Sequence, residues 1–202
     1  MQKRRIAIAA AALAAAVTLA ACGSDSKKDS GGSATTPADS KPAAPSVSWP
    51  APADASAQVK AAGLPMLGQE GQVLHIHSHL DVYVDGKVVT VPAEIGIDVV
   101  KQQISPLHTH DTSGVVHIES PVKADFTLGQ FMTEWQVPIG KGALGPLKAG
   151  GGKELHVYVN GKEQTGDPAA VKLAAHEEIA VVYGAAGDKV RVPTSYNWPQ
   201  GL

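Results

Sequence analysis

Histidines dominate the chemistry that this sequence offers. Six of the eight histidines lie between residues 75 and 117, in the motifs His75-Ile76-His77-Ser78-His79, His108-Thr109-His110 and His117-Ile118-Glu119. Several imidazole nitrogens that converge on one point, at about 2.0–2.1 Å from an ion, make a site for Zn²⁺ or a similar metal. The clustering therefore predicts a metal site formed by His75, His77, His79, His108, His110 and His117.

The first motif requires a β-strand to position it. Residues two apart on a strand project to the same side. Over residues 72–84 this alternation places His75, His77 and His79 on one face together with Asp81. The opposite face is then apolar, with Leu74, Ile76, Leu80, Val82 and Val84. The pattern predicts a strand with a histidine face and a core face.

The remaining ligands are predicted on a hairpin of residues 107–111 and 115–119. A four-residue turn at 111–114 would place His108 opposite His117, whereas a bulge at Gly114 would shift this register by one residue. Asp111 and Glu119 lie beside histidines in the sequence, and we expect them to orient the imidazoles through hydrogen bonds. Six imidazoles exceed the needs of one ion, so one ion and two ions both remain open.

Cu²⁺ and Zn²⁺ are the metals that the donor types favour. The set contains imidazoles without a thiolate, and copper binds more tightly than zinc to nitrogen sites of this kind. The two other histidines, His156 and His176, stand alone in the sequence. We expect these two to be surface residues and not ligands.

The rest of the chain predicts an α+β fold. Asp85-Gly86 and Asn160-Gly161 are two-residue hairpin signals, and residues 80–87 resemble residues 155–162. Apolar residues at helical spacing predict one helix over residues 127–135 with Thr127 as its N-cap. Residues 140–152 are rich in glycine and are predicted to be a loop. The expected architecture is mostly antiparallel β hairpins in two similar halves with one central helix.

The N-terminus carries an export pattern. Lys3, Arg4 and Arg5 precede an apolar run, and Leu19-Ala20-Ala21-Cys22 resembles the lipobox of bacterial lipoproteins. The resemblance implies cleavage after residue 21 and lipidation of Cys22, which several acyl chains would anchor in a membrane. We therefore expect a signal peptide (1–21), a disordered lipid-anchored linker (22–62) and a folded, histidine-rich, β-dominated domain (63–202).

Charge excludes one class of partner. Removal of the signal peptide would leave 14 basic against 19 acidic residues, because three of the 17 basic residues belong to it. A chain with this balance and no cluster of Lys or Arg is not expected to bind nucleic acid. The membrane and a metal ion are the partners that the sequence indicates.

From Gly63 onward the sequence resembles a group of uncharacterised bacterial lipoproteins and envelope proteins. The residues that carry the resemblance are His75-Ile76-His77-Ser78-His79-Leu80, Ser105-Pro106-Leu107-His108-Thr109-His110-Asp111, Gly114-Val115-Val116-His117-Ile118-Glu119-Ser120 and Thr127-Leu128-Gly129-Gln130-Phe131. The resemblance implies a place in the cell envelope and carries no established activity.

We therefore expect a lipid-anchored, extracytoplasmic protein that binds copper or zinc for carriage, storage or sensing, without catalysis. One alternative is a metal-dependent enzyme, in which three histidines hold an ion and leave a position for water. A second is an envelope interaction module without metal, whose histidines respond to pH.

Overall fold

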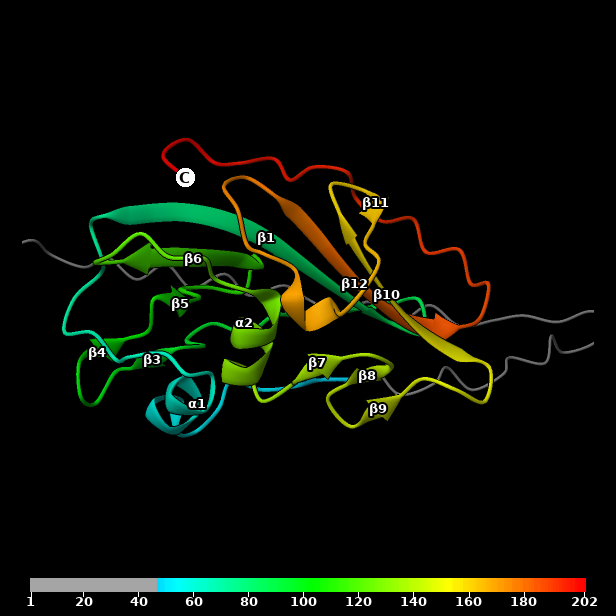
Figure 1. Cartoon of the computed structure of the whole chain (residues 1–202), viewed down its shortest axis with the longest axis horizontal. Coiled ribbons are helices and arrows are strands. Elements are labelled where there is room, and N and C mark those ends of the chain that lie inside the picture. Colours follow the sequence, from blue (N-terminus) through cyan, green and yellow to red (C-terminus); the bar gives the residue numbers. More distant parts are fainter. Residues whose placement is uncertain (1–46) are drawn as a thin grey trace, which may run out of the picture. The chain divides into compact units, whose positions relative to one another are not determined.

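The computed structural model describes residues 47–202 (Figure 1). The predictions for the signal peptide, for Cys22 and for the first part of the linker lie outside these residues. Within residues 47–202, no helix has the length and apolar character that crossing a bilayer requires. The helices here are α1 (Ala55–Ala61), α2 (Leu128–Glu134) and a short 3₁₀ helix, η1 (Pro168–Ala170).

A seven-stranded sheet forms the centre of the fold. Its strands follow the order β11-β10-β12-β1-β6-β5, and β2 also pairs with β1. β1 and β12 run parallel and the other pairs are antiparallel, so the sheet is mixed. The bounds are β1 Leu74–Val84, β2 Lys87–Val89, β5 Leu107–His108, β6 Val115–Ser120, β10 Lys153–Val159, β11 Lys162–Glu163 and β12 Glu178–Ala185.

Two small antiparallel sheets accompany the large one. The first pairs β3 (Ile97–Asp98) with β4 (Gln103–Ile104), and the second joins β7 (Ile139–Gly140), β8 (Ala143–Leu144) and β9 (Leu147–Lys148). The glycine-rich segment 140–152, predicted as a loop, therefore contains short strands. Strands of two residues are too short to give a periodic pattern, which is why the sequence did not indicate them.

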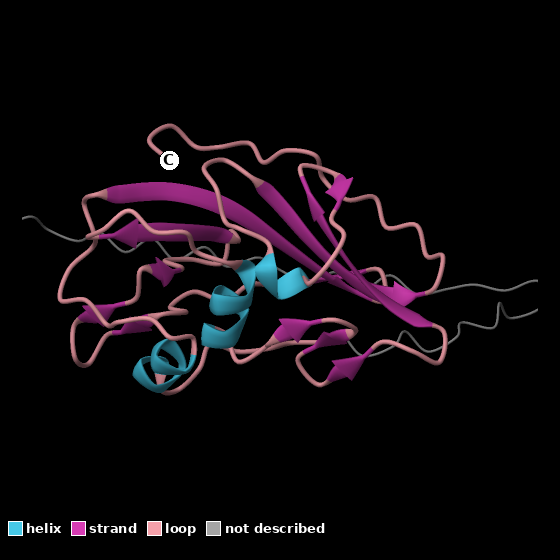
Figure 2. Ribbon diagram, viewed as in Figure 1, coloured by secondary structure: helices cyan, strands magenta, loops and turns pink. Residues whose placement is uncertain are grey.

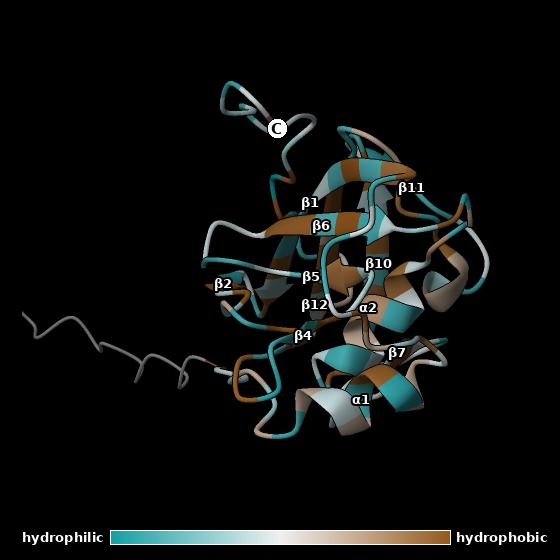
Figure 3. Cartoon of the chain, turned by 90° about the vertical axis from the view of Figure 1, so that its left-hand side faces the viewer, coloured by the Kyte–Doolittle hydropathy of each residue, from teal (hydrophilic) through white to brown (hydrophobic). Residues whose placement is uncertain are grey.

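Helix α2 lies against one face of the sheet and fills the core (Figures 2 and 3). The predicted N-cap is confirmed: Thr127 accepts a hydrogen bond from the Gln130 amide, and the Gln130 side chain accepts one from the Thr127 amide. This capping box satisfies amides that a helix start leaves unpaired. The helix residues Leu128, Phe131 and Met132 are fully buried.

The N-terminal part of the described chain also packs onto α2. Trp135 Nε1 donates a hydrogen bond to the Trp49 carbonyl over 3.1 Å, and the two rings meet edge to face. Val59 of α1 is fully buried. Residues 47–62, which the sequence analysis assigned to the linker, thus belong to the same compact unit as the sheet.

The two hairpins that the turn signals predicted are present. Asp85-Gly86 joins β1 to β2, and Asn160-Gly161 joins β10 to β11, with positive φ at all four residues. Positive φ at both central residues is the requirement of a type I′ turn. The fold is therefore α+β. It contains α1 in addition to the predicted helix α2, and its sheet contains one parallel pair of strands, β1 and β12. The similarity of the two halves stays a prediction.

The C-terminal segment after β12 lies on the opposite side of the sheet from the helices (Figure 1). Tyr196 in this segment stacks on His79 of β1, with ring centroids 3.9 Å apart. Because α2 occupies the core face, this contact identifies the other face as the histidine face.

Candidate metal centre

Three histidines form a row across three adjacent strands. His77 of β1 is the register partner of His117 of β6, and His117 is the partner of His108 of β5. Directly opposed residues on neighbouring strands project to the same face. Ring centroids are 4.6 Å apart for His77 and His117 and 5.2 Å apart for His117 and His108. The unbulged register at His108 and His117 is the one expected for a four-residue turn.

His75, His110 and Glu119 surround this row. The ring of His75 lies 5.1 Å from that of His77, and the ring of His110 lies 4.5 Å from that of His117. Glu119 is the register partner of His75 and is buried. We call His75, His77, His108, His110, His117 and Glu119 the histidine cluster.

The Glu119 carboxylate lies among the imidazoles of the histidine cluster. Its Oε1 is 3.1 Å from His117 Nδ1, 3.3 Å from His75 Nε2 and 3.9 Å from His108 Nε2. A ligating histidine commonly donates its second ring N–H to a carboxylate, which fixes the ring and increases its basicity. Glu119 Oε1 is placed either to accept this bond from His117 Nδ1, which is the orienting role predicted from the sequence, or to share an ion with that nitrogen.

His108 is oriented by the backbone. Its Nδ1 lies 3.0 Å from the carbonyl oxygen of Ser105, which can only accept. In the neutral ring Nδ1 therefore carries the proton, and Nε2 keeps a free lone pair. That Nε2 lies 3.2 Å from His110 Nε2. The hydroxyl of Ser105 donates to the buried Glu134 over 2.6 Å, so α2 supports the loop that holds His108.

Two polar atoms of the cluster are buried without a hydrogen-bond partner among the described residues, His77 Nε2 and Glu119 Oε2. Burying a polar atom without a hydrogen bond lowers the stability of the fold unless another group, such as an ion, binds that atom. Both atoms are of types that coordinate metals. The residues present therefore fit an ion held by imidazole nitrogen and carboxylate oxygen.

Electrostatics keep the row neutral. Burial, followed by the proximity of other imidazoles, lowers the pKa of His77 to about 4 and that of His117 to about 4. Burial is also the main reason why the pKa of His108 falls to about 3. These rings are unprotonated at pH 7. They offer lone pairs, which is the state that a metal requires.

Glu70, which the sequence analysis did not single out, lies at the edge of the cluster. Its Oε1 is 3.7 Å from His110 Nε2. Burial, and next the charge of Glu70, raise the pKa of Glu119. The neighbouring Gly71 passes so close to β6 that a Cβ there would overlap the backbone of Ser120. This close approach holds Glu70 beside the cluster.

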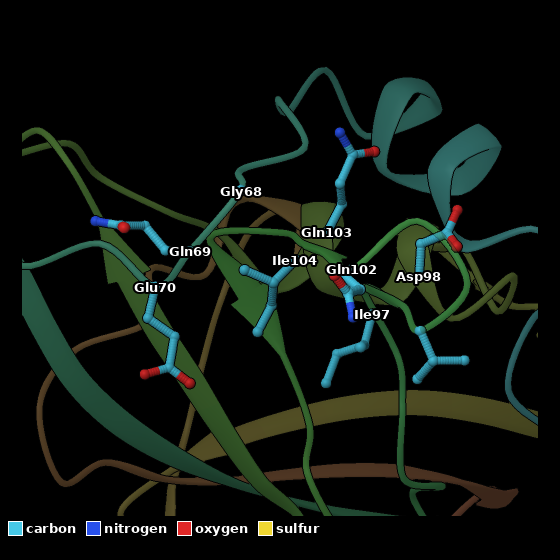
Figure 4. A pocket seen from close by; sticks show the side chains of 9 residues that line it. Gly68, Gln69, Glu70, Ile97, Asp98, Gln102, Gln103 and Ile104 are labelled. Carbon is cyan, nitrogen blue, oxygen red and sulfur yellow. The ribbon is translucent and has the colours of Figure 1, made fainter.

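A pocket of about 400 Å³ begins at Glu70. Figure 4 shows Glu70 at one end and Asp98 at the other, with Ile97 and Ile104 between them. The pocket lies between the loop before β1 and the β3–β4 hairpin. Because Glu70 also approaches His110, one carboxylate belongs to both the pocket and the edge of the cluster.

His79 is set apart from the other predicted ligands. Its Nδ1 lies 2.8 Å from Glu178 Oε2, and its Nε2 lies 2.8 Å from the Ser113 carbonyl oxygen. Burial works to lower the pKa of His79, but the hydrogen bond and charge of Glu178 outweigh it and raise that pKa. Both nitrogens therefore face acceptors, and a ring that donates to both has no lone pair left for an ion. His79, Asp81 and Glu178 nevertheless form a third group whose donor atoms lie within 4.8 Å of one another.

Asp111, predicted to orient an imidazole, instead accepts a hydrogen bond from the Ser113 amide within its own turn. Of the two isolated histidines, His156 lies apart from the cluster, whereas the backbone amide of His176 donates to the carbonyl of His77 over 2.7 Å. His156 of β10 is held between Glu163 and Glu154, at 2.6 Å and 3.1 Å. His176 is exposed and contacts the C-terminal Leu202 carbonyl.

Comparison of the chain with known protein families, with curated proteins and with solved structures found no match. Five neutral or exposed imidazoles and a carboxylate converge on one face of the sheet, and such a set can bind a divalent transition metal.

Proposed function

We propose that this protein binds Cu²⁺ or Zn²⁺ through the histidine cluster and carries, stores or senses the metal without catalysis. The observation that carries the proposal is the cross-strand row of His77, His117 and His108, in which the buried Nε2 of His77 has no hydrogen-bond partner among residues 47–202. His108 and His117 offer donor atoms close enough to share one ion, and His77 does so with His75 and Glu119, so these strands need little rearrangement to bind metal.

The lowered pKa values support the same proposal. At pH 7 a metal would not have to displace protons from His77, His108 or His117, because their pKa values are between about 3 and 4. Copper is expected to bind more tightly than zinc by the Irving–Williams order. The lipobox pattern at Cys22 favours a site outside the cytoplasm, tethered to a membrane by lipid.

Equilibrium dialysis of the full chain, produced without a polyhistidine tag, tests this function. The chain is dialysed against Cu²⁺ or Zn²⁺, and bound metal is measured by mass spectrometry. We expect retention at pH 7 that is lost in a variant with His77, His108 and His117 all changed to Gln. Equal retention by that variant and by the original chain would contradict the proposal.

A second candidate function is a metal-dependent enzyme with three histidines and a water position. The pocket of about 400 Å³ that Glu70 shares with the edge of the cluster favours it, because a substrate there would lie beside the ion. A bound water with a pKa near 7 would supply the nucleophile for hydrolysis. Hydrolysis of a panel of activated esters by the Zn²⁺-loaded chain would favour this alternative, provided that Glu70→Gln reduces the rate.

A further inference from the structure

We infer that the histidine cluster binds two metal ions side by side and that Glu119 bridges them. The inference rests on the proposed metal-binding function and adds the number of ions and the ligands of each. It starts from the way in which the donors divide. One set contains His108, His110 and His117, the other contains His75 and His77, and Glu119 belongs to both.

The first subsite is the more buried of the two. His108 Nε2 and His110 Nε2 are 3.2 Å apart. Two ligands at about 2.0–2.1 Å from a tetrahedral ion are separated by roughly this distance. His117 is adjacent to both rings, which brings a third imidazole to the same point. Because His108 Nδ1 donates its proton to the Ser105 carbonyl, Nε2 is the nitrogen of His108 that has a lone pair for an ion.

The second subsite lies at the start of β1. His77 Nε2 is buried and has no partner among the described residues, and His75 Nε2 is 3.3 Å from Glu119 Oε1. Two imidazoles and one carboxylate oxygen give three donors. Half of the His75 side chain is exposed, at 48%, so water can complete the coordination of this ion.

Glu119 is the group that both subsites share. Its Oε1 approaches His75 of one set and His117 and His108 of the other, whereas Oε2 has no hydrogen-bond partner within the described part of the chain. An ionised carboxylate offers about four lone-pair positions over two oxygens, enough for two ions. Its charge, with that of Glu70 at the edge, also reduces the repulsion between two dications. Two-metal sites in proteins typically hold their ions about 3.5–4 Å apart.

The number of bound ions and their magnetic coupling test the inference. The full chain without a polyhistidine tag is titrated with Cu²⁺, bound metal is counted after dialysis, and the electron paramagnetic resonance spectrum is recorded. We expect two ions per chain and a half-field signal, because the dipolar coupling of two Cu²⁺ ions rises steeply as they approach. Zn²⁺ is counted in the same way.

Three variants assign the subsites. Glu119→Gln is expected to abolish the half-field signal. The pair His75→Gln with His77→Gln, and separately the pair His108→Gln with His110→Gln, should each leave one ion and an uncoupled spectrum. Since each pair leaves Glu119 in place, they keep the test valid if Glu119→Gln does not fold. His156→Gln is the matched control and should retain two coupled ions.

The outcomes separate this inference from the function on which it rests. One ion per original chain, lost in either pair of variants, would overturn the two-ion centre and leave metal binding intact. Two ions that give the full-intensity spectrum of isolated Cu²⁺ centres would overturn the bridge. No bound metal would overturn both the inference and the proposed function.

Discussion

His77 and His79 lie two residues apart on one face of β1, yet their surroundings are opposite. His77 faces other imidazoles, and its buried Nε2 has no partner among the described residues. His79 faces Glu178 and the Ser113 carbonyl, so both of its nitrogens are satisfied. The pKa of the first is lowered and that of the second is raised. The neighbouring strands, and not the His-x-His spacing alone, therefore decide which partners each histidine has.

The largest effect is expected from His79→Ala. This change leaves the buried Glu178 without its partner, and removal of one member of a buried ion pair costs about 3–5 kcal/mol of unfolding free energy. The number of bound metal ions should not change in the folded protein. Urea unfolding and metal counting at pH 7 check both statements.

His77→Ala is the matched comparison on the same strand. It removes a ring whose Nε2 has no partner among the residues that the structure describes. We therefore expect a smaller loss of stability than for His79→Ala, together with weaker metal binding. The reverse result, with His79 controlling metal and His77 controlling stability, would break the distinction between the two histidines.

The next effect is on affinity. His108→Gln removes the fully buried imidazole whose Nε2 is held toward His110. We expect the dissociation constant for Cu²⁺ to rise more than about 100-fold, which is beyond the roughly 10- to 100-fold typical of outer hydrogen-bond partners. Competition with a chelator of known affinity measures the change. His156→Gln, the control, should bind as the original chain does.

The opposite pKa shifts predict opposite dependences on pH for the metal-free protein. Below about pH 6.5 the unfolded chain protonates His77, His108 and His117, whereas the folded chain resists protonation until about pH 3–4. Unfolding free energy should therefore fall on acidification across this window, by up to about 1.4 kcal/mol per pH unit for each histidine.

The contribution of His79 to the unfolding free energy should have the opposite dependence on pH. Its contribution is present below its unfolded pKa of 6.5 and is lost as pH rises through its raised folded pKa.

Denaturant unfolding between pH 4 and pH 9 checks these signs. The variant His77→Gln should flatten the acidic side of the profile, and His79→Gln should flatten the side above pH 6.5. A metal-free protein that becomes more stable between pH 6.5 and pH 4 would contradict the assignment of neutral, buried rings in the row.

The smallest effect is expected from Glu70→Gln. Glu70 is 45% exposed and 3.7 Å from His110, so solvent screens its charge. The dissociation constant for Cu²⁺ should rise less than about 10-fold, by weaker attraction of the cation. This effect should shrink at high salt, which titration in low and high NaCl measures. If Glu70→Gln raised the dissociation constant as much as His108→Gln does, Glu70 would itself be a ligand and this prediction would be wrong.

The sequence predicted the parts of the site that depend on local pattern. Alternation along residues 72–84 predicted one face for His75 and His77, and a four-residue turn at 111–114 predicted His108 opposite His117, with which the register of β5 and β6 agrees. The cap at Thr127 was also predictable, because a capping box is a local signal. These features require only residues that are near one another in the chain or in paired hairpins.

The features that the sequence did not predict depend on distant contacts. Glu178 meets His79 through the parallel pairing of β12 with β1, across 99 positions of the chain. Glu70 reaches the cluster because Gly71 fits against the backbone of β6. Neither contact has a periodic pattern, so the separation of His79 from the other histidines became visible only in three dimensions.

X-ray absorption at the copper edge of the loaded full chain tests the central claim most directly. We expect several imidazole nitrogens at about 2.0–2.1 Å from each ion, with the outer-ring scattering of histidine. His79→Gln should leave the spectrum unchanged, and His108→Gln should lower the number of imidazoles. A spectrum with oxygen ligands alone would contradict the account.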